Sequence, residues 1–170
     1  MRFLKLAVAS LVILFLLVTA MGLLFPSTVR VSRAIDINVP TDSVYKIIAD
    51  FAYWPQWVDG LANQTPETSN GFTSGKGAKV KFGSNEIVFT GLSDSLVVTE
   101  WKGINGNTQE GNFRIIGYQD TSITTVNWFF LEHLHWYPWE RFGSMMNDNI
   151  LGPVMEKSLE NLKRVAEKRN

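Results

Sequence analysis

The chain has 170 residues, 45% of them hydrophobic, which is enough for one folded domain and an additional segment. Its formal charge is zero, and removing Arg2 and Lys5 from the 16 basic residues leaves 14 against 16 acidic ones, a net of −2, so no basic footprint for nucleic acid is present. The chain has no cysteine, which excludes disulfides, iron–sulfur clusters and thiol catalysis.

A long uncharged segment lies near the start of the chain. Leu6 to Phe25 is a run of 20 residues, and a helix over it is about 30 Å long, the thickness of a bilayer's hydrocarbon core. We predict that residues 6–25 form a membrane anchor. A cleaved signal peptide is the alternative, since Arg2 and Lys5 form a basic start and Ala20 is a small residue of the kind found at cleavage sites. The anchor is favoured because the apolar run continues to Phe25.

The anchor divides the chain into residues 1–28 (head, anchor and short tether) and residues 29–170 (a folded domain). The tether, residues 26–28, reaches about 10 Å when extended, so the domain is expected against the membrane surface. Arg2 and Lys5 on one side nearly balance Arg30 and Arg33 on the other. The short head favours a cytoplasmic N-terminus, which places the domain outside the cytoplasm, in the periplasm of a bacterium.

The domain begins with a strand and two short helices. Apolar and polar residues alternate from Val29 to Val39, except where Arg33 and Ala34 exchange the expected polarity, and Pro40 ends this strand. Thr41 or Asp42 is the predicted cap of a helix that buries Val44, Ile47, Ile48 and Phe51. Asp50 is the predicted cap of a second short helix, which contains Tyr53, Trp54 and Trp57.

A run of strands follows. Residues 63–74 form a loop or an irregular edge strand, after which five β-rich segments are separated by short polar connections: Ala78–Phe82, Glu86–Thr90, Leu96–Trp101, Asn112–Tyr118 and Ile123–Leu131. Such connections make antiparallel neighbours. The predicted sheet has six strands, or seven with the edge segment.

A long amphipathic helix closes the chain, from Trp139 to Arg169. Its apolar residues recur at helical spacing and predict one buried stripe: Phe142, Met145, Met146, Ile150, Val154, Met155, Leu159, Leu162, Val165 and Ala166. Gly152 and Pro153 interrupt the run, and we predict a kink there or a second helix that starts at Pro153. The fold class is therefore α+β, with a curved antiparallel sheet around the last helix.

Three blocks of residues resemble the START-like superfamily, also called SRPBCC or Bet v 1-like, and most closely its polyketide cyclase/dehydrase branch. They are Ser32–Pro40 with Val44, Tyr45, Ile48, Asp50, Trp54 and Trp57; Gly75–Ala78; and Tyr137–Trp139 through Leu151–Pro153 to Leu159–Lys163. The resemblance covers residues 29–168. It implies a helix-grip fold with a cavity between sheet and last helix that takes an apolar or amphipathic molecule, and it leaves the individual function open.

Catalytic motifs are sparse. The serine of Gly71–Gly75 is misplaced for a nucleophile elbow, and no phosphate-binding glycine loop occurs. His133 and His135 would share a strand face beside Glu132, as zinc ligands do, but no third ligand has convincing spacing. Glu100 and Glu132 lie in predicted strands that are otherwise mostly apolar. A buried carboxylate there could act as an acid or base, but a sheet with one solvated face accounts for both residues equally well. We therefore assign no catalytic residue, metal or cofactor.

Aromatic residues and methionines are the stronger signal. The predicted ligand-binding residues are Trp101, Val126, Trp128 and Phe130 from the strands and Phe142, Met145, Met146 and Ile150 from the helix. The alternative for each of them is simple core packing. A second aromatic group is either core, the favoured interpretation, or a mouth that faces lipid headgroups: Phe51, Tyr53, Trp54, Trp57, Trp136, Tyr137 and Trp139.

Three functions remain at this stage. The leading hypothesis is a membrane-anchored domain that binds a hydrophobic small molecule or lipid without covalent chemistry. The second is a cyclase- or dehydratase-type enzyme that uses Glu100, Glu132 or His133 in the cavity. The third is an envelope protein-interaction module with a vestigial cavity. The sequence identifies no protein partner.

Overall fold

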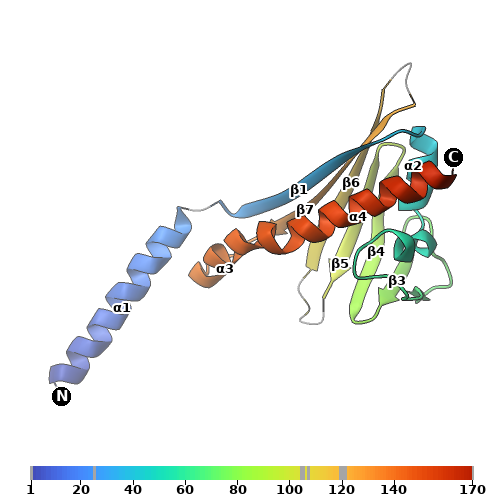
Figure 1. Ribbon diagram of the computed structural model, residues 1–170. Coiled ribbons are helices and arrows are strands. Elements are labelled where there is room, and N and C mark those ends of the chain that lie inside the picture. The colour runs from blue at the N-terminus through green and yellow to red at the C-terminus, as the bar shows by residue number, and fades with distance from the viewer. Residues whose placement is uncertain (1, 25, 104–105, 107, 119–121, 170) are drawn as a thin grey trace.

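The computed structural model of the chain describes residues 2–24, 26–103, 106, 108–118 and 122–169, except for the side chain of Met145 (Figure 1). The helices are α1 (Arg2–Leu23), α2 (Thr41–Ile48), η1 (Phe51–Gln56), α3 (Pro138–Gly143), η2 (Ser144–Met146) and α4 (Asn147–Arg169). The strands are β1 (Thr28–Ile37), β2 (Glu67–Thr68), β3 (Lys79–Phe82), β4 (Asn85–Ser93), β5 (Leu96–Lys102), β6 (Thr108–Gly117) and β7 (Thr124–His133). Phe25, the last residue of the predicted anchor, lies outside the described residues.

The seven strands form one antiparallel sheet in the order β1-β7-β6-β5-β4-β3-β2. This confirms the predicted α+β fold, including the option that the irregular segment pairs as an edge strand, which β2 does with β3. The first and last strands are neighbours along their whole length, from Thr28 opposite His133 to Ile37 opposite Thr124. Figure 1 shows α4 lying across the sheet and α1 projecting away from the domain.

The two short helices differ in how they begin. Asp50 caps η1 as predicted, because its carboxylate accepts a hydrogen bond of 2.9 Å from the backbone N–H of Ala52. The prediction that Thr41 or Asp42 caps α2 is wrong. The residue before α2 is Pro40, and no side chain caps the helix. Thr41 is instead the first helical residue, and its hydroxyl lies 3.4 Å from that of Thr124.

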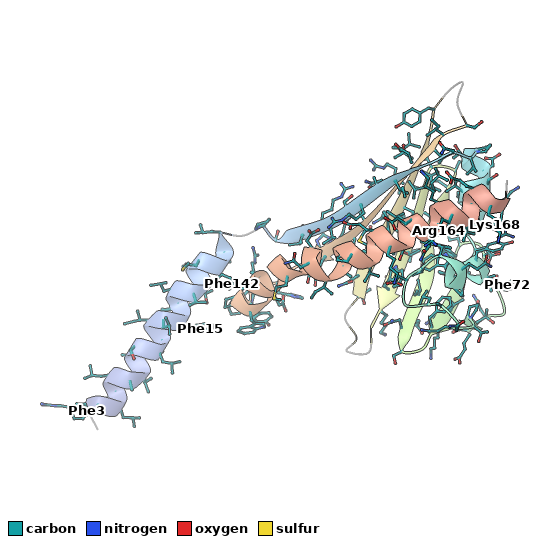
Figure 2. The ribbon with its side chains drawn as sticks, in the orientation of Figure 1. Phe3, Phe15, Phe72, Phe142, Arg164 and Lys168 are labelled. Carbon is teal, nitrogen blue, oxygen red and sulfur yellow. The ribbon has the colours of Figure 1, made fainter. Side chains whose placement is uncertain are left out.

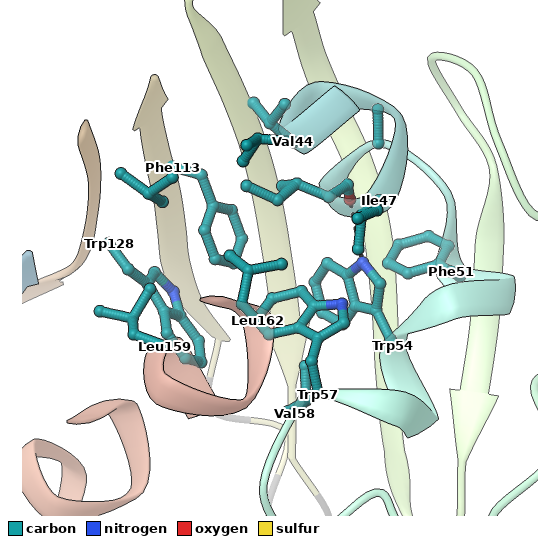
Figure 3. Packing of buried hydrophobic residues seen from close by; sticks show 14 of the residues in the cluster. Val44, Ile47, Phe51, Trp54, Trp57, Val58, Phe113, Trp128, Leu159 and Leu162 are labelled. Atoms are coloured by element: carbon teal, nitrogen blue, oxygen red, sulfur yellow. Dashed lines mark hydrogen bonds between the residues drawn. The ribbon is translucent and has the colours of Figure 1, made fainter. Parts of the chain in front are cut away.

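Aromatic rings fill the space between the sheet, η1 and the C-terminal part of α4. Leu159 and Leu162 of α4 face Trp57, Phe113 and Trp128 (Figure 3). Phe51, Trp54 and Trp57 are fully buried, which confirms the core interpretation for this half of the second aromatic group. The other half differs, because Trp136 and Trp139 are 52% and 62% exposed.

The predicted closing helix is broken earlier than expected. The break lies at η2, between α3 and α4, whereas Pro153 lies inside α4, so a second helix starting at Pro153 is wrong. The glycine beside it has a packing reason, since a Cβ at Gly152 would collide with the guanidinium of Arg33. Gly152 therefore lets β1 and α4 approach, and it does not end the helix.

Arg33 explains the exchanged polarity in the first strand. It lies on the side of β1 that faces α4, where its guanidinium donates to Asp148 Oδ1 at 2.9 Å and to Glu156 Oε1 at 2.6 Å. The hydrogen bonds from Arg33 hold the pKa of Asp148 below its ordinary value of 3.8. A charged residue in a helix-facing position is thus paired with two carboxylates.

The lowered pKa of Asp148 predicts a pH-dependent contribution to stability. Because the folded-state pKa is the lower one, this contribution is complete above the ordinary value and is lost as the pH falls through the folded-state value. We expect Arg33→Ala to weaken the acid dependence of the free energy of unfolding, measured by urea titration of the full chain in detergent from about pH 6 to about pH 3. An unchanged pH profile would show that the pair contributes nothing.

Gly152 gives a second prediction, in which the sign depends on Arg33. Alanine favours a helix over glycine by about 1 kcal/mol, but in the native chain it displaces the guanidinium. Gly152→Ala should therefore destabilise the native chain and stabilise the Arg33→Ala variant. A double-mutant cycle by chemical denaturation measures this coupling. Equal effects in both backgrounds would contradict it.

Candidate functional site: an apolar cavity beside α4

An apolar cavity of about 390 Å³ lies between α4, the sheet and the loop after η1. Its wall is contributed by Val58, Asp59, Gly60, Leu61, Asn85, Trp101, Lys102, Gly103, Gln109, Trp128, Phe130, Leu151, Val154 and Met155. The volume falls within the range of small-molecule sites, which is about 300–1,000 Å³. The cavity flanks the first half of α4, while the space beside the second half is filled by the aromatic core.

Trp101 forms the floor and is held in place by a short hydrogen-bonded chain. Its indole Nε1 donates to Thr99 Oγ1 at 2.9 Å, and that hydroxyl donates to the carbonyl of Gly111 at 2.7 Å. A Cβ at Gly111 would lie 2.7 Å from Trp101 Nε1, so only glycine permits this approach. We did not single out Gly111 from the sequence, although a glycine inside a β-rich run signals a close contact.

The two neighbouring aromatic residues of β7 form the inner wall. Trp128 and Phe130 lie two residues apart on one strand and therefore share a face. Their ring centroids lie 6.4 Å and 5.6 Å from that of Trp101. Of the four predicted strand residues, these three line the cavity, and Val126 is fully buried in the core. Ligand binding by them stays a prediction.

The predicted helix residues lie elsewhere. Phe142, Met146 and Ile150 are 36%, 60% and 61% exposed on the outside of α3, η2 and α4, away from the cavity wall, and the side chain of Met145 lies outside the described residues. Leu151, Val154 and Met155 supply the helix side of the wall instead. Ile150 lies inside α4, beyond the break at η2, so the break does not explain its exposure. The apolar period in the sequence shows that this face is apolar, but it does not show which face meets the sheet.

The loop after η1 covers the cavity and is tied to α4. The backbone N–H of Asp59 donates to Ser158 Oγ at 2.8 Å, and the Asp59 carboxylate pairs with Lys157 at 2.8 Å. Asn161 adds a hydrogen bond of 3.2 Å to the carbonyl of Trp57. Sequence reasoning missed this cover because its contacts join residues about 100 positions apart.

A second, polar hollow of about 550 Å³ lies at the end of β7, and it contains the carboxylate and histidines noted in the sequence. Glu132 accepts a hydrogen bond from Asn147 there, and His135 Nδ1 lies 3.1 Å from Glu140 Oε2. Glu132 and His133 border this hollow, not the apolar cavity, and Glu100 is exposed on β5. Among the described residues, no group of three or more His, Asp or Glu is placed to hold a metal ion.

Solved structures with the same fold were found at low sequence identity. A protein from Thermobifida fusca has a TM-score of 0.63 at 15% identity, covering 82% of this chain and 93% of its own. A START superfamily protein from Mycobacterium smegmatis has a TM-score of 0.57 at 15% identity, covering 83% and 99%. The di-domain ARO/CYC protein BexL, from the BE-7585A biosynthetic pathway, has a TM-score of 0.61 at 12% identity, covering 83% and 50%. These likenesses show the fold alone.

The sequence itself matches one family model over most of its length and no curated protein. The match covers residues 28–167, which is the whole sheet and α4 up to its last turn. This range agrees with the resemblance to the START-like superfamily carried by the three sequence blocks. The chain therefore belongs to the family described as polyketide cyclase/dehydrase and lipid transport.

Proposed function

We propose that this protein is a membrane-anchored binding domain that holds a hydrophobic small molecule or lipid in the cavity beside α4, without covalent chemistry. The observation that carries the proposal is the cavity wall itself. Its inner part is aromatic and aliphatic, formed by Trp101, Trp128, Phe130, Leu151 and Met155. Lys102, Gln109 and Asp59 lie on the same wall and provide polar groups. An amphipathic ligand fits this combination best.

The family description supports a ligand-binding role, since it includes lipid transport. The cavity also weighs against the interaction module, the third option from the sequence, because a fully packed interior would have favoured that option. The occupant remains defined by class only: a molecule with an apolar body small enough for about 390 Å³, or part of a longer lipid.

The proposal includes the anchor. Among the described residues, one helix is long and apolar enough to cross a membrane, and this helix is α1. We assign residues 1–28 to head, anchor and tether and residues 29–170 to the binding domain, outside the cytoplasm and hence in the periplasm of a bacterium. The tether is short and fixed, since Leu134 donates a 2.8 Å backbone hydrogen bond to Ser27. The domain is thereby kept near the bilayer, from which an apolar ligand would come.

Closing the cavity without disturbing the core tests the proposal. Val154 lies on the cavity wall and is 38% exposed, so a tryptophan there has room to turn into the opening. We expect Val154→Trp to reduce retention of apolar molecules by about tenfold or more, equivalent to at least ~1.4 kcal/mol. For the measurement, the full chain is incubated with a bacterial lipid extract and then released from detergent. Mass spectrometry identifies the small molecules that remain bound to it.

Ile150→Trp is the matched control, because Ile150 lies one helical turn earlier and outside the cavity wall. It should retain the same molecules as the native chain. Loss of binding in both variants would indicate a non-specific effect of the added ring. A native chain that retains no molecule from the extract would contradict the binding function.

A second candidate is the cyclase- or dehydratase-type enzyme, and the observation that favours it is the polar hollow bordered by Glu132 and His133. A general base there should remove a proton next to a carbonyl. This candidate predicts that the chain catalyses deuterium exchange into acetylacetone, a simple 1,3-dicarbonyl, as measured by NMR. Glu132→Gln should reduce the rate by about 100-fold, while Glu100→Gln, which changes an exposed carboxylate, should not. Absence of catalysed exchange in the native chain removes this candidate.

A further inference from the structure

An apolar stripe runs along the outside of α3, η2 and the first turns of α4. It consists of Trp139, Phe142, Met146, Ile150 and Val154, with exposures of 62%, 36%, 60%, 61% and 38%. Steps of three and four residues place these side chains along one line. The stripe ends at Val154. Three residues later, Lys157 forms an ion pair with Asp59. The outer face of the same helix is therefore apolar at one end and charged at the other.

The apolar end of this helix lies against the proposed anchor. α1 and α3 are in contact, and Gly22 is the buried residue of α1. A Cβ at Gly22 would lie 3.4 Å from the Cα of Pro138, the first residue of α3. Two contacts join the segment that follows α1 to the segment that precedes α3. They are the backbone hydrogen bond from Leu134 to Ser27, and the approach of Thr28 Oγ1 to within 3.3 Å of His133 Nδ1. α3 is thus fixed at the level of the last turn of α1.

If α1 spans a bilayer, the last turn of α1 defines the depth of α3 in the membrane. The last turn of a spanning helix lies at the boundary between hydrocarbon and headgroups, where tryptophan and tyrosine are enriched. The residues just before and at the start of α3 are of this kind, and their rings lie close together. Ring centroids are 4.8 Å apart between Trp136 and Tyr137, and 5.0 Å apart between Tyr137 and Trp139. Figure 2 shows Phe142 on α3, on the side of the molecule that carries α1.

We propose that α3, η2 and the first two turns of α4 form an interfacial segment that rests in the bilayer surface, with Trp139, Phe142, Met146 and Ile150 in contact with lipid. The inference rests on the anchor proposed above. Amphipathic helices of this type bury their apolar face at the boundary between headgroups and acyl chains. Burial in lipid removes from water a set of large apolar side chains that the domain itself leaves exposed.

The composition of the stripe and its position favour a membrane over a protein partner. A contact with a second copy or another protein does not require the stripe to start at the anchor or to begin beside the aromatic rings of Trp136 and Tyr137. Val154 also belongs to the cavity wall, so the far end of the stripe meets the opening of the cavity. A molecule that leaves the bilayer along the stripe would enter the cavity with little exposure to water.

The absence of cysteine allows a direct test by single-cysteine labelling of the full chain. Trp139→Cys and Ile150→Cys report on the stripe, and Leu11→Cys, 69% exposed on α1, reports on the anchor. Two further variants report on positions outside the stripe. Lys157→Cys places the label just beyond the stripe, and Phe72→Cys places it at the end of the domain far from α1 (Figure 2). Each variant carries a spin label and is reconstituted in vesicles of phosphatidylcholine and phosphatidylglycerol. Accessibility to oxygen, which concentrates in lipid, is compared with accessibility to a water-soluble nickel chelate.

We expect a severalfold higher oxygen-to-nickel ratio at positions 11, 139 and 150 than at positions 157 and 72. A high ratio at 11 with low ratios at 139 and 150 overturns the interfacial segment and leaves the anchor intact. A low ratio at 11 removes the anchor and this inference with it. Protection of 139 and 150 from both reagents shows a protein contact and also overturns the proposal. Circular dichroism confirms that each variant is folded, and ligand retention is measured separately.

Discussion

The position of α4 is the constraint on which the rest of the structure depends. Along one flank it is fastened at three levels to β1 and the residue that follows it: by Arg33, by Lys163 to the carbonyl of Asp36 at 2.9 Å, and by Glu167 to Asn38 at 3.1 Å. Along the other flank, the fastening to the loop after η1 starts only at Lys157 and Ser158. The turns before that point face open volume. The cavity is therefore where the helix is held on one side only.

The sheet and the strand half of the site were predictable because strand geometry is rigid. A period of two residues fixes which side chains share a face, so Trp128 and Phe130 had to point the same way, and short polar connections required antiparallel neighbours. Asp50 was predictable for a similar reason, since a cap acts within a few residues. Arg33 was noticed as an irregularity, but its partners on α4 follow it by more than 100 positions and no local rule connects them.

The helix half was not predictable because periodicity shows that a face is apolar and not what covers it. Phe142, Met146 and Ile150 recur as core residues do, yet they lie on the outside of the helices. An exposed apolar face and a face that meets a sheet obey the same spacing. Gly152 was interpreted as a helix breaker although it accommodates Arg33. Gly111 was overlooked because its role lies in the close approach of Trp101 from the neighbouring strand.

The proposed location changes what the cavity must achieve. A ligand apolar enough to leave water for the cavity is also apolar enough to stay in the bilayer, because lipid chains are as apolar as leucine side chains. Transfer from lipid to protein therefore gains little from the hydrophobic effect, and selection must come from shape and from fixed polar groups. Trp101 is held by Thr99 and Gly111, so its ring cannot adapt freely. The wall that this ring forms with Trp128 and Phe130 would select a ligand by fit, while Lys102 and Gln109 would hold its polar end.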